Sequence, residues 1–180
     1  KKYPKEKKLK LLLAKVMFQK KDYDKAITLY KVYLEKDPNN LEALKGLSES
    51  YAEKKEYKNT VKILKKMLKI APMNPVYNNN TCWYLAKDKK YDKALKYCQK
   101  ALEIAPTEHF ILDSMGYALA GKGKHQEAID YYHKAISVYP KDPEQMMHLA
   151  DSYKALGENT QAIEYRSEER RVGKECTLRC

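Results

Sequence analysis

Apolar side chains recur along this chain at intervals of three and four residues, the spacing that places them on one face of an α-helix. One set of these positions comprises Leu13, Leu47, Met115 and Leu149. A second set comprises Ile27, Val61, Leu95, Ile129 and Ile163. Short polar segments separate the two sets, at 20–22, 54–56, 122–124 and 156–158. The pattern predicts pairs of helices joined by turns, and no stretch alternates long enough to predict a β-strand.

The helix pairs repeat with a fixed period of 34 residues. The period is visible in five prolines, Pro4, Pro38, Pro72, Pro106 and Pro140, and the other two, Pro75 and Pro143, are separated by twice that interval. Proline marks helix starts and ends because it lacks an N–H and clashes with the preceding turn. A period without insertions predicts one helical hairpin repeated in tandem, which is a solenoid.

Two columns of small residues share this period. The first contains Ala14, Ser48, Cys82, Gly116 and Ala150, and the second contains Ala26, Thr60, Ala94, Ala128 and Ala162. Small side chains at this offset allow two antiparallel helices to approach closely. Each second helix is expected to begin at Tyr23, Tyr57, Tyr91, His125 or Asn159.

With this period, the small-residue pair, the aromatic start of the second helix and the closing proline, the chain resembles the tetratricopeptide repeat (TPR) family. The resemblance implies an all-α, right-handed α-solenoid that serves as a non-catalytic protein-interaction scaffold. We expect full repeats at 7–40, 41–74, 75–108 and 109–142, and a partial fifth repeat at 143–165. Residues 1–6 are expected to be the remnant of a preceding repeat.

The last fifteen residues differ from the rest. Residues 1–165 contain 31 lysines and no arginine, whereas 166–180 contain four arginines. Arg166, Glu169 and Arg170 stand where the earlier repeats carry core residues, which would be costly in a helix packed in the usual way. The segment Arg166 to Cys176 also resembles a translated sequencing adapter. We therefore expect 166–180 to be a non-native tail, with a divergent capping helix as the alternative.

The formal net charge is +12, of which five basic and three acidic residues of the tail supply +2. Lysines are good helix formers on solvated faces, so the charge alone gives weak support for binding nucleic acid or an anionic membrane. The four histidines fall in different phases of the period, and the Gly121-Lys122-Gly123-Lys124 segment lacks the strand that precedes a phosphate-binding loop. The sequence predicts no enzyme activity, metal site or cofactor, and it leaves the localisation open.

The resemblance implies that first helices line a concave groove that binds a protein or peptide partner. The candidate groove residues are Val76, Asn79, Asn80, Trp83, Phe110, Asp113, Ser114, Tyr117, Lys45 and Glu49. Trp83, Phe110 and Tyr117 are expected to form an aromatic floor beside the two asparagine amides, which can both donate to and accept from a peptide backbone. The alternative is that Trp83 packs between repeats as core.

Chaperone-binding members of the family hold a terminal carboxylate with Lys, Asn, Asn, Lys and Arg. The best register matches Lys45 and Asn80 but places Glu49, Phe110 and Ser114 at the other three positions. An acidic group beside a carboxylate opposes such a clamp, so we reject it.

Cys82 and Cys98 belong to the two helices of one repeat, on either side of its turn. We expect two buried thiols, with a disulfide as the alternative in an oxidising compartment. Two other functions also remain open. One is a regulatory or substrate-docking segment of a larger enzyme of the glycosyltransferase or kinase type, and the other is a lysine-rich binder of nucleic acid or anionic membrane.

Overall fold

The structure, a computed structural model, describes residues 4–177, and these form ten α-helices and no strand. The helices are α1 (Pro4–Gln19), α2 (Tyr23–Lys36), α3 (Leu41–Glu53), α4 (Tyr57–Ile70), α5 (Pro75–Lys87), α6 (Tyr91–Ile104), α7 (His109–Gly121), α8 (His125–Val138), α9 (Pro143–Ala155) and α10 (Asn159–Thr177). The second helices α2, α4, α6, α8 and α10 begin at the aromatic or polar residues that the sequence predicted. The all-α solenoid of helical hairpins is confirmed.

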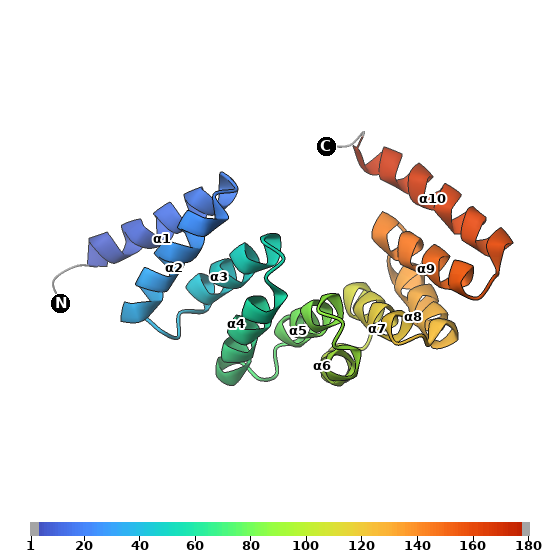
Figure 1. The fold of residues 1–180 in the computed structure, drawn as a ribbon, viewed down its shortest axis with the longest axis horizontal. Coiled ribbons are helices and arrows are strands. Elements are labelled where there is room, and N and C mark those ends of the chain that lie inside the picture. The colour runs from blue at the N-terminus through green and yellow to red at the C-terminus, as the bar shows by residue number, and fades with distance from the viewer. Residues whose placement is uncertain (1–3, 178–180) are drawn as a thin grey trace.

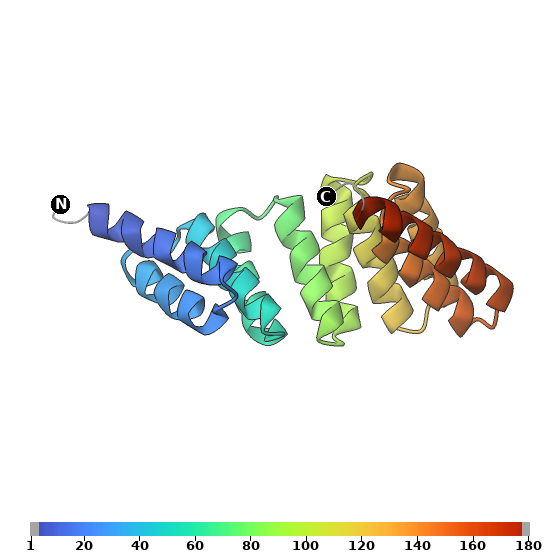
Figure 2. The ribbon, with the colours of Figure 1, turned by 90° about the horizontal axis from the view of Figure 1, so that it is seen from above.

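The hairpins are stacked into an open arch (Figure 1). Helices α3, α5, α7 and α9 follow the inner side of the arch, while α4, α6 and α8 lie on its outer side. Seen from above, the helices lie side by side along the length of the molecule (Figure 2). Among the inner helices, α5 and α7 pack most closely, whereas α3 and α5 lie farther apart. Residues one repeat apart therefore come together on adjacent inner helices.

The turn inside each hairpin contains one residue in the left-handed region of backbone space. Lys21, Lys55 and Lys89 have φ between 57° and 60°, and Gly123 and Gly157 have φ of 85° and 81°. The left-handed conformation costs a residue with a Cβ about 1–2 kcal/mol relative to glycine. In the first three repeats the hairpin geometry therefore overrides the local preference of lysine.

Gly116 provides the closest approach in the first small column. A Cβ at this position of α7 would lie 2.5 Å from Cε1 of Tyr132, a side chain of α8 that is 1% exposed. Gly46 of α3 makes a comparable contact between hairpins, because a Cβ there would meet the Tyr30 ring of α2 in the preceding hairpin. A tyrosine ring thus fills the space that a small inner-helix residue leaves open.

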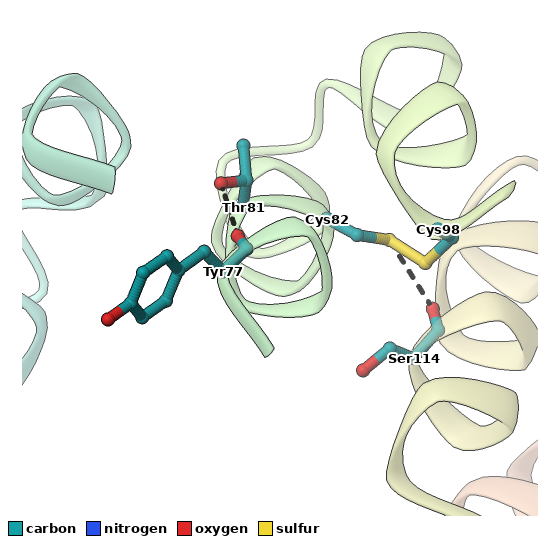
Figure 3. The surroundings of a disulfide bond; sticks show 5 residues. All are labelled: Tyr77, Thr81, Cys82, Cys98 and Ser114. Carbon is teal, nitrogen blue, oxygen red and sulfur yellow. Dashed lines mark hydrogen bonds between the residues drawn. A yellow bond between two sulfur atoms is a disulfide. The ribbon is translucent and has the colours of Figure 1, made fainter. Parts of the chain in front are cut away.

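Cys82 of α5 and Cys98 of α6 form a disulfide in the structure, which is the alternative rather than the pair of free thiols that we favoured (Figure 3). The antiparallel hairpin places their Cα atoms 5.3 Å apart, within the range that a disulfide requires. The Cys82 sulfur also lies 3.9 Å from the Ser114 carbonyl oxygen of α7. Because a disulfide sulfur has no proton, this contact becomes a hydrogen bond only when the pair is reduced.

Thr81 interrupts the large apolar column that contains Leu47 and Met115. Its side chain is fully buried, and its hydroxyl donates a 2.7 Å hydrogen bond to the Tyr77 carbonyl one turn earlier (Figure 3). This local bond satisfies the hydroxyl without a partner from another helix.

Helix α10 continues through the segment that we expected to be a non-native tail. Arg166 is half-buried and pairs with Asp151 at 2.5 Å and with Glu169 at 3.2 Å, and Val172 is 4% exposed. Arg166 therefore has carboxylate partners at a position where the earlier repeats carry core residues. The origin of the segment stays a sequence-based expectation.

At the other end, α1 begins at Pro4 and includes residues 4–6, and their origin in a preceding repeat stays a sequence-based expectation. The rest of the expected N-terminal remnant, residues 1–3, and the end of the tail, residues 178–180, lie outside the described residues.

We predict that Gly116→Ala destabilises the protein. Alanine raises helix propensity by about 1 kcal/mol, but the new Cβ must displace the buried Tyr132 ring, which typically costs about 1–3 kcal/mol. Urea unfolding should show a net loss of about 1 kcal/mol. Gly173→Ala in α10 is the matched control, because a Cβ there meets no atom within 4 Å, and it should cause no loss.

We also predict that the Cys82–Cys98 disulfide stabilises the third hairpin. Its sequence separation of 16 residues corresponds to an entropic stabilisation of about 3 kcal/mol. In a Cys176→Ser, Cys180→Ser background, thiol titration in denaturant without reductant should find no free thiol, and reductant should lower the free energy of unfolding by about that amount. Two titratable thiols before reduction would contradict the disulfide.

Candidate functional site on the inner face

Trp83 and Tyr117 form an aromatic pair across two repeats. They stand one period apart, on α5 and α7, the two inner helices in closest contact. Their ring centroids are 4.8 Å apart at an interplanar angle of 46°, and both side chains are half-buried. Trp83 therefore contacts the next repeat without being enclosed as core. Trp83 thus packs between adjacent repeats, as the core interpretation expects, and stays partly exposed, as the groove interpretation expects.

Lys87 covers both rings of this pair. It follows Trp83 by four residues, so the two side chains share one face of α5. The Lys87 ammonium nitrogen lies 4.2 Å from the Trp83 ring centroid and 4.5 Å from that of Tyr117. Both distances are well within the range of cation–π attraction. We call Trp83, Tyr117 and the space over their rings that the Lys87 ammonium occupies the aromatic slot.

A buried acid–histidine pair borders the slot. Asp113 of α7 and His148 of α9 are 7% and 5% exposed, and Asp113 Oδ1 lies 2.9 Å from His148 Nδ1. The His148 ring centroid is 5.0 Å from Tyr117 and 5.9 Å from Trp83. The pair thus joins α7 to α9 and packs against the aromatic rings.

Tyr132 of α8 lies beneath this pair, with its ring centroid 5.8 Å from that of His148. Burial raises the pKa of the Tyr132 hydroxyl well above its usual value, and the negative charge of Asp113 raises it further. The neutral phenol therefore supports the slot from the outer helix layer and does not act as a base at ordinary pH.

The predicted amides occupy unequal environments. Asn79 is 6% exposed and its side-chain oxygen is buried without a hydrogen-bond partner among the described residues. Asn80 is half-buried, and Ser114 on α7 is 3% exposed. The side chain of Asn80 is therefore more accessible to a ligand than that of Asn79.

Phe110 was expected to form an aromatic floor with Trp83 and Tyr117, and the structure places its ring contact elsewhere. Phe110 precedes Tyr117 by seven residues on α7, which is about 10 Å along a helix axis. Its ring instead makes an edge-to-face contact with His109, at a centroid distance of 5.7 Å. Val76 is 44% exposed at the start of α5. These two residues form a second position on the inner helices, separate from the slot.

Lys45 and Glu49 lie on α3, one repeat before the slot. Lys45 is exposed, and its ammonium nitrogen is 3.8 Å from Glu49 Oε1. Burial raises the pKa of Glu49, Lys45 opposes that shift, and the nearby charge of Glu53 adds to it. Glu49 occupies the position on α3 that is equivalent to Trp83 one repeat later, and α3 lies farther from α5 than α7 does.

Our candidate set omitted one residue that the structure brings to the aromatic pair, Lys87. The four-residue spacing from Trp83 to Lys87 was a usable signal for it. His148 of the fifth repeat, which the sequence also places on the groove side, meets Asp113 because α7 and α9 bring together side chains one period plus one residue apart.

Two other kinds of site, a metal site and a membrane span, are not found within residues 4–177. No group of three or more histidine, cysteine or acidic side chains is placed to hold a metal ion in that range. None of the described helices combines the length and the apolar character needed to cross a membrane.

Two family models match the chain. The model of the TT21 fifth ARM repeats domain matches residues 7–101, and the tetratricopeptide repeat model matches residues 109–142. No curated protein sequence matches this chain.

Solved structures of similar fold are TPR-type arrays. A crystal structure of MamA superposes with a TM-score of 0.75 at 22% identity, covering 92% of this chain and 96% of that one. MamA 41-end from Desulfovibrio magneticus RS-1 gives 0.81 at 19% identity, covering 95% and 97%. TTC0263, a thermophilic TPR protein in Thermus thermophilus, gives 0.77 at 18% identity, covering 96% and 95%.

At these identities the structural likeness concerns the fold alone. It agrees with the 34-residue helical hairpins, the stacked arch and the two family models. The chain therefore belongs to the tetratricopeptide-repeat family.

Proposed function

We propose that this chain is a non-catalytic scaffold that binds an extended segment of a partner protein along the inner face of α3, α5, α7 and α9. The observation that carries the proposal is the half-buried Trp83–Tyr117 pair, which spans two repeats on that face. Aromatic side chains that combine a large apolar surface with a fixed position are the usual anchors of protein interfaces.

The surroundings of the pair favour binding over catalysis. The Asp113–His148 pair is more than nine-tenths buried, and no described hydroxyl or thiol nucleophile is bonded to the histidine. A nucleophile held by a general base is the usual arrangement for covalent catalysis. The acid–histidine pair instead joins two inner helices and fixes the ring of Tyr117 beside the slot.

A long inner face also suits an extended ligand. Adjacent packed helices are typically about 8–10 Å apart, so α5, α7 and α9 extend over about 20 Å. An extended chain advances about 3.3 Å per residue, so roughly six residues would cross α5 to α9. Asn80, which is half-buried on α5 three residues before Trp83, offers both a donor and an acceptor to such a backbone.

We predict that Trp83→Ala weakens binding of a partner recovered with the wild-type chain and then purified. Loss of a central aromatic anchor typically costs about 2 kcal/mol or more, which is about 30-fold in affinity. Asn80→Ala should weaken binding less, by about fivefold, since it removes a single neutral hydrogen-bonding group. Isothermal titration calorimetry measures both effects.

Tyr97→Ala on the outer helix α6 is the matched control, because it removes a half-buried aromatic ring from the opposite layer. Circular dichroism should show unchanged helicity in all three variants. Equal affinity of Trp83→Ala and the wild-type chain for the partner would remove the inner face as the binding surface.

A further inference from the structure

Charge is distributed unevenly between the two layers of the arch. The inner helices α3, α5, α7 and α9 carry six carboxylates and three lysines, a net charge of −3. The outer helices α2, α4, α6 and α8 carry twelve lysines and six carboxylates, a net charge of +6. The first helix α1, which packs against α3, adds five lysines and one glutamate, so the acidic part of the inner side is limited to α3 through α9.

The acidic residues bracket the aromatic positions in register. One column of equivalent positions on α3, α5, α7 and α9 contains Glu49, Trp83, Tyr117 and Asp151. A second column, two turns earlier on each helix, contains Glu42, Val76, Phe110 and Glu144. In both columns the two middle positions, on α5 and α7, are apolar, and the two end positions, on α3 and α9, are carboxylates. The same order occurs twice, so the inner face presents an apolar centre with acidic flanks.

These carboxylates are open to exchange of their counter-ions. Glu42, Glu144 and Asp151 are exposed, and Glu42 pairs with Lys15 of α1 while Asp151 pairs with Arg166 of α10. Exposed ion pairs of this kind contribute little stability, so a cation of the ligand can replace Lys15 or Arg166 at small cost. Glu49 has only the 3.8 Å contact with Lys45.

The aromatic slot already holds a cation. The Lys87 ammonium lies against two ring faces, at 4.2 Å and 4.5 Å from their centroids, and none of the described carboxylates forms an ion pair with it. Its position shows that an ammonium group on an aliphatic stem fits against the rings of Trp83 and Tyr117 together. A lysine from a ligand would make the same contacts.

We propose that the aromatic slot is a lysine-binding subsite, and that Lys87 occupies it while no ligand is bound to the inner face. Its occupant in the complex is a lysine side chain of a basic, extended segment of a partner protein. This assignment rests on the proposed function and specifies the chemistry of its ligand. On binding, the Lys87 ammonium leaves the rings for solvent, which its flexible four-carbon stem permits.

The competing assignment is a carboxylate ligand held by Lys87. It would place an anion on an inner face with twice as many carboxylates as lysines, with Asp113 and Glu49 on the neighbouring inner helices. Charge complementarity favours the lysine. The two assignments predict opposite effects for the removal of the Lys87 charge.

The test titrates the full chain and its Lys87→Met variant with two peptides. Both are alanine-based and extended, one carrying two lysines and the other two glutamates at the same positions. Trp83 is the only tryptophan in the chain, so its fluorescence reports directly on the slot. Methionine keeps the length and the apolar stem of Lys87 but removes the positive charge that attracts it to the two rings.

The expected result is a saturable change in Trp83 emission with the lysine peptide, about fivefold tighter for Lys87→Met than for the wild-type chain. The glutamate peptide should cause no saturable change. Lys100→Met is the matched control, because it removes an equivalent lysine–aromatic contact on outer helix α6, and its affinity should equal that of the wild type.

Saturable binding of the glutamate peptide that Lys87→Met abolishes would overturn the proposal in favour of a carboxylate ligand. The absence of saturation with the lysine peptide in both proteins would also overturn it. Self-association in sedimentation that Trp83→Ala abolishes would assign the slot to a second copy of this chain and likewise overturn it. None of these results removes the inner face as a binding surface, which only the partner-affinity measurement tests.

Discussion

The close approach of neighbouring helical hairpins is the constraint on which the rest of this structure depends. A single hairpin cannot bury its apolar face alone, so each one is stabilised mainly by contact with the next. The contact requires small residues where helices meet, as at Gly46 of α3, where the Tyr30 ring of the preceding hairpin occupies the space that a side chain would need. The same contact sets the register that brings side chains one period apart together on the inner face.

The aromatic slot is a consequence of that register. Trp83 and Tyr117 lie in different repeats, and their rings meet because α5 and α7 pack closely. Asp113 and His148 extend the same pattern to α9, and the disulfide joins α5 to the outer helix behind it. These contacts join the third, fourth and fifth hairpins to one another, and the candidate site lies on this part of the inner face.

The fold was predictable because it depends on periodicity. The spacing of the prolines and small residues indicated the number, order and starting points of the hairpins, and these features require no knowledge of side-chain contacts. The location of Trp83 and Tyr117 on one face followed from the same period. The choice between free thiols and a disulfide did not, since it depends on the distance between Cys82 and Cys98 in the folded hairpin and on the redox conditions.

The finer features of the site depend on three-dimensional distances. Phe110 shares a face with Tyr117 but lies two turns away, so sequence register grouped residues that the structure separates. Lys87 was overlooked because a lysine at the end of a helix resembles the many solvated lysines of this chain, and only its position over two rings distinguishes it. The helical character of 166–177 was also missed, since Arg166 has carboxylate partners at a position where the earlier repeats carry core residues.

Hydrogen exchange of the chain with and without a bound partner protein tests the central claim most directly, because it maps the contacted layer without any substitution. The account predicts slower amide exchange in α5 and α7, extending to α3 and α9, with α4, α6 and α8 unchanged. Slower exchange confined to the outer helices, with the inner ones unaffected, would contradict it.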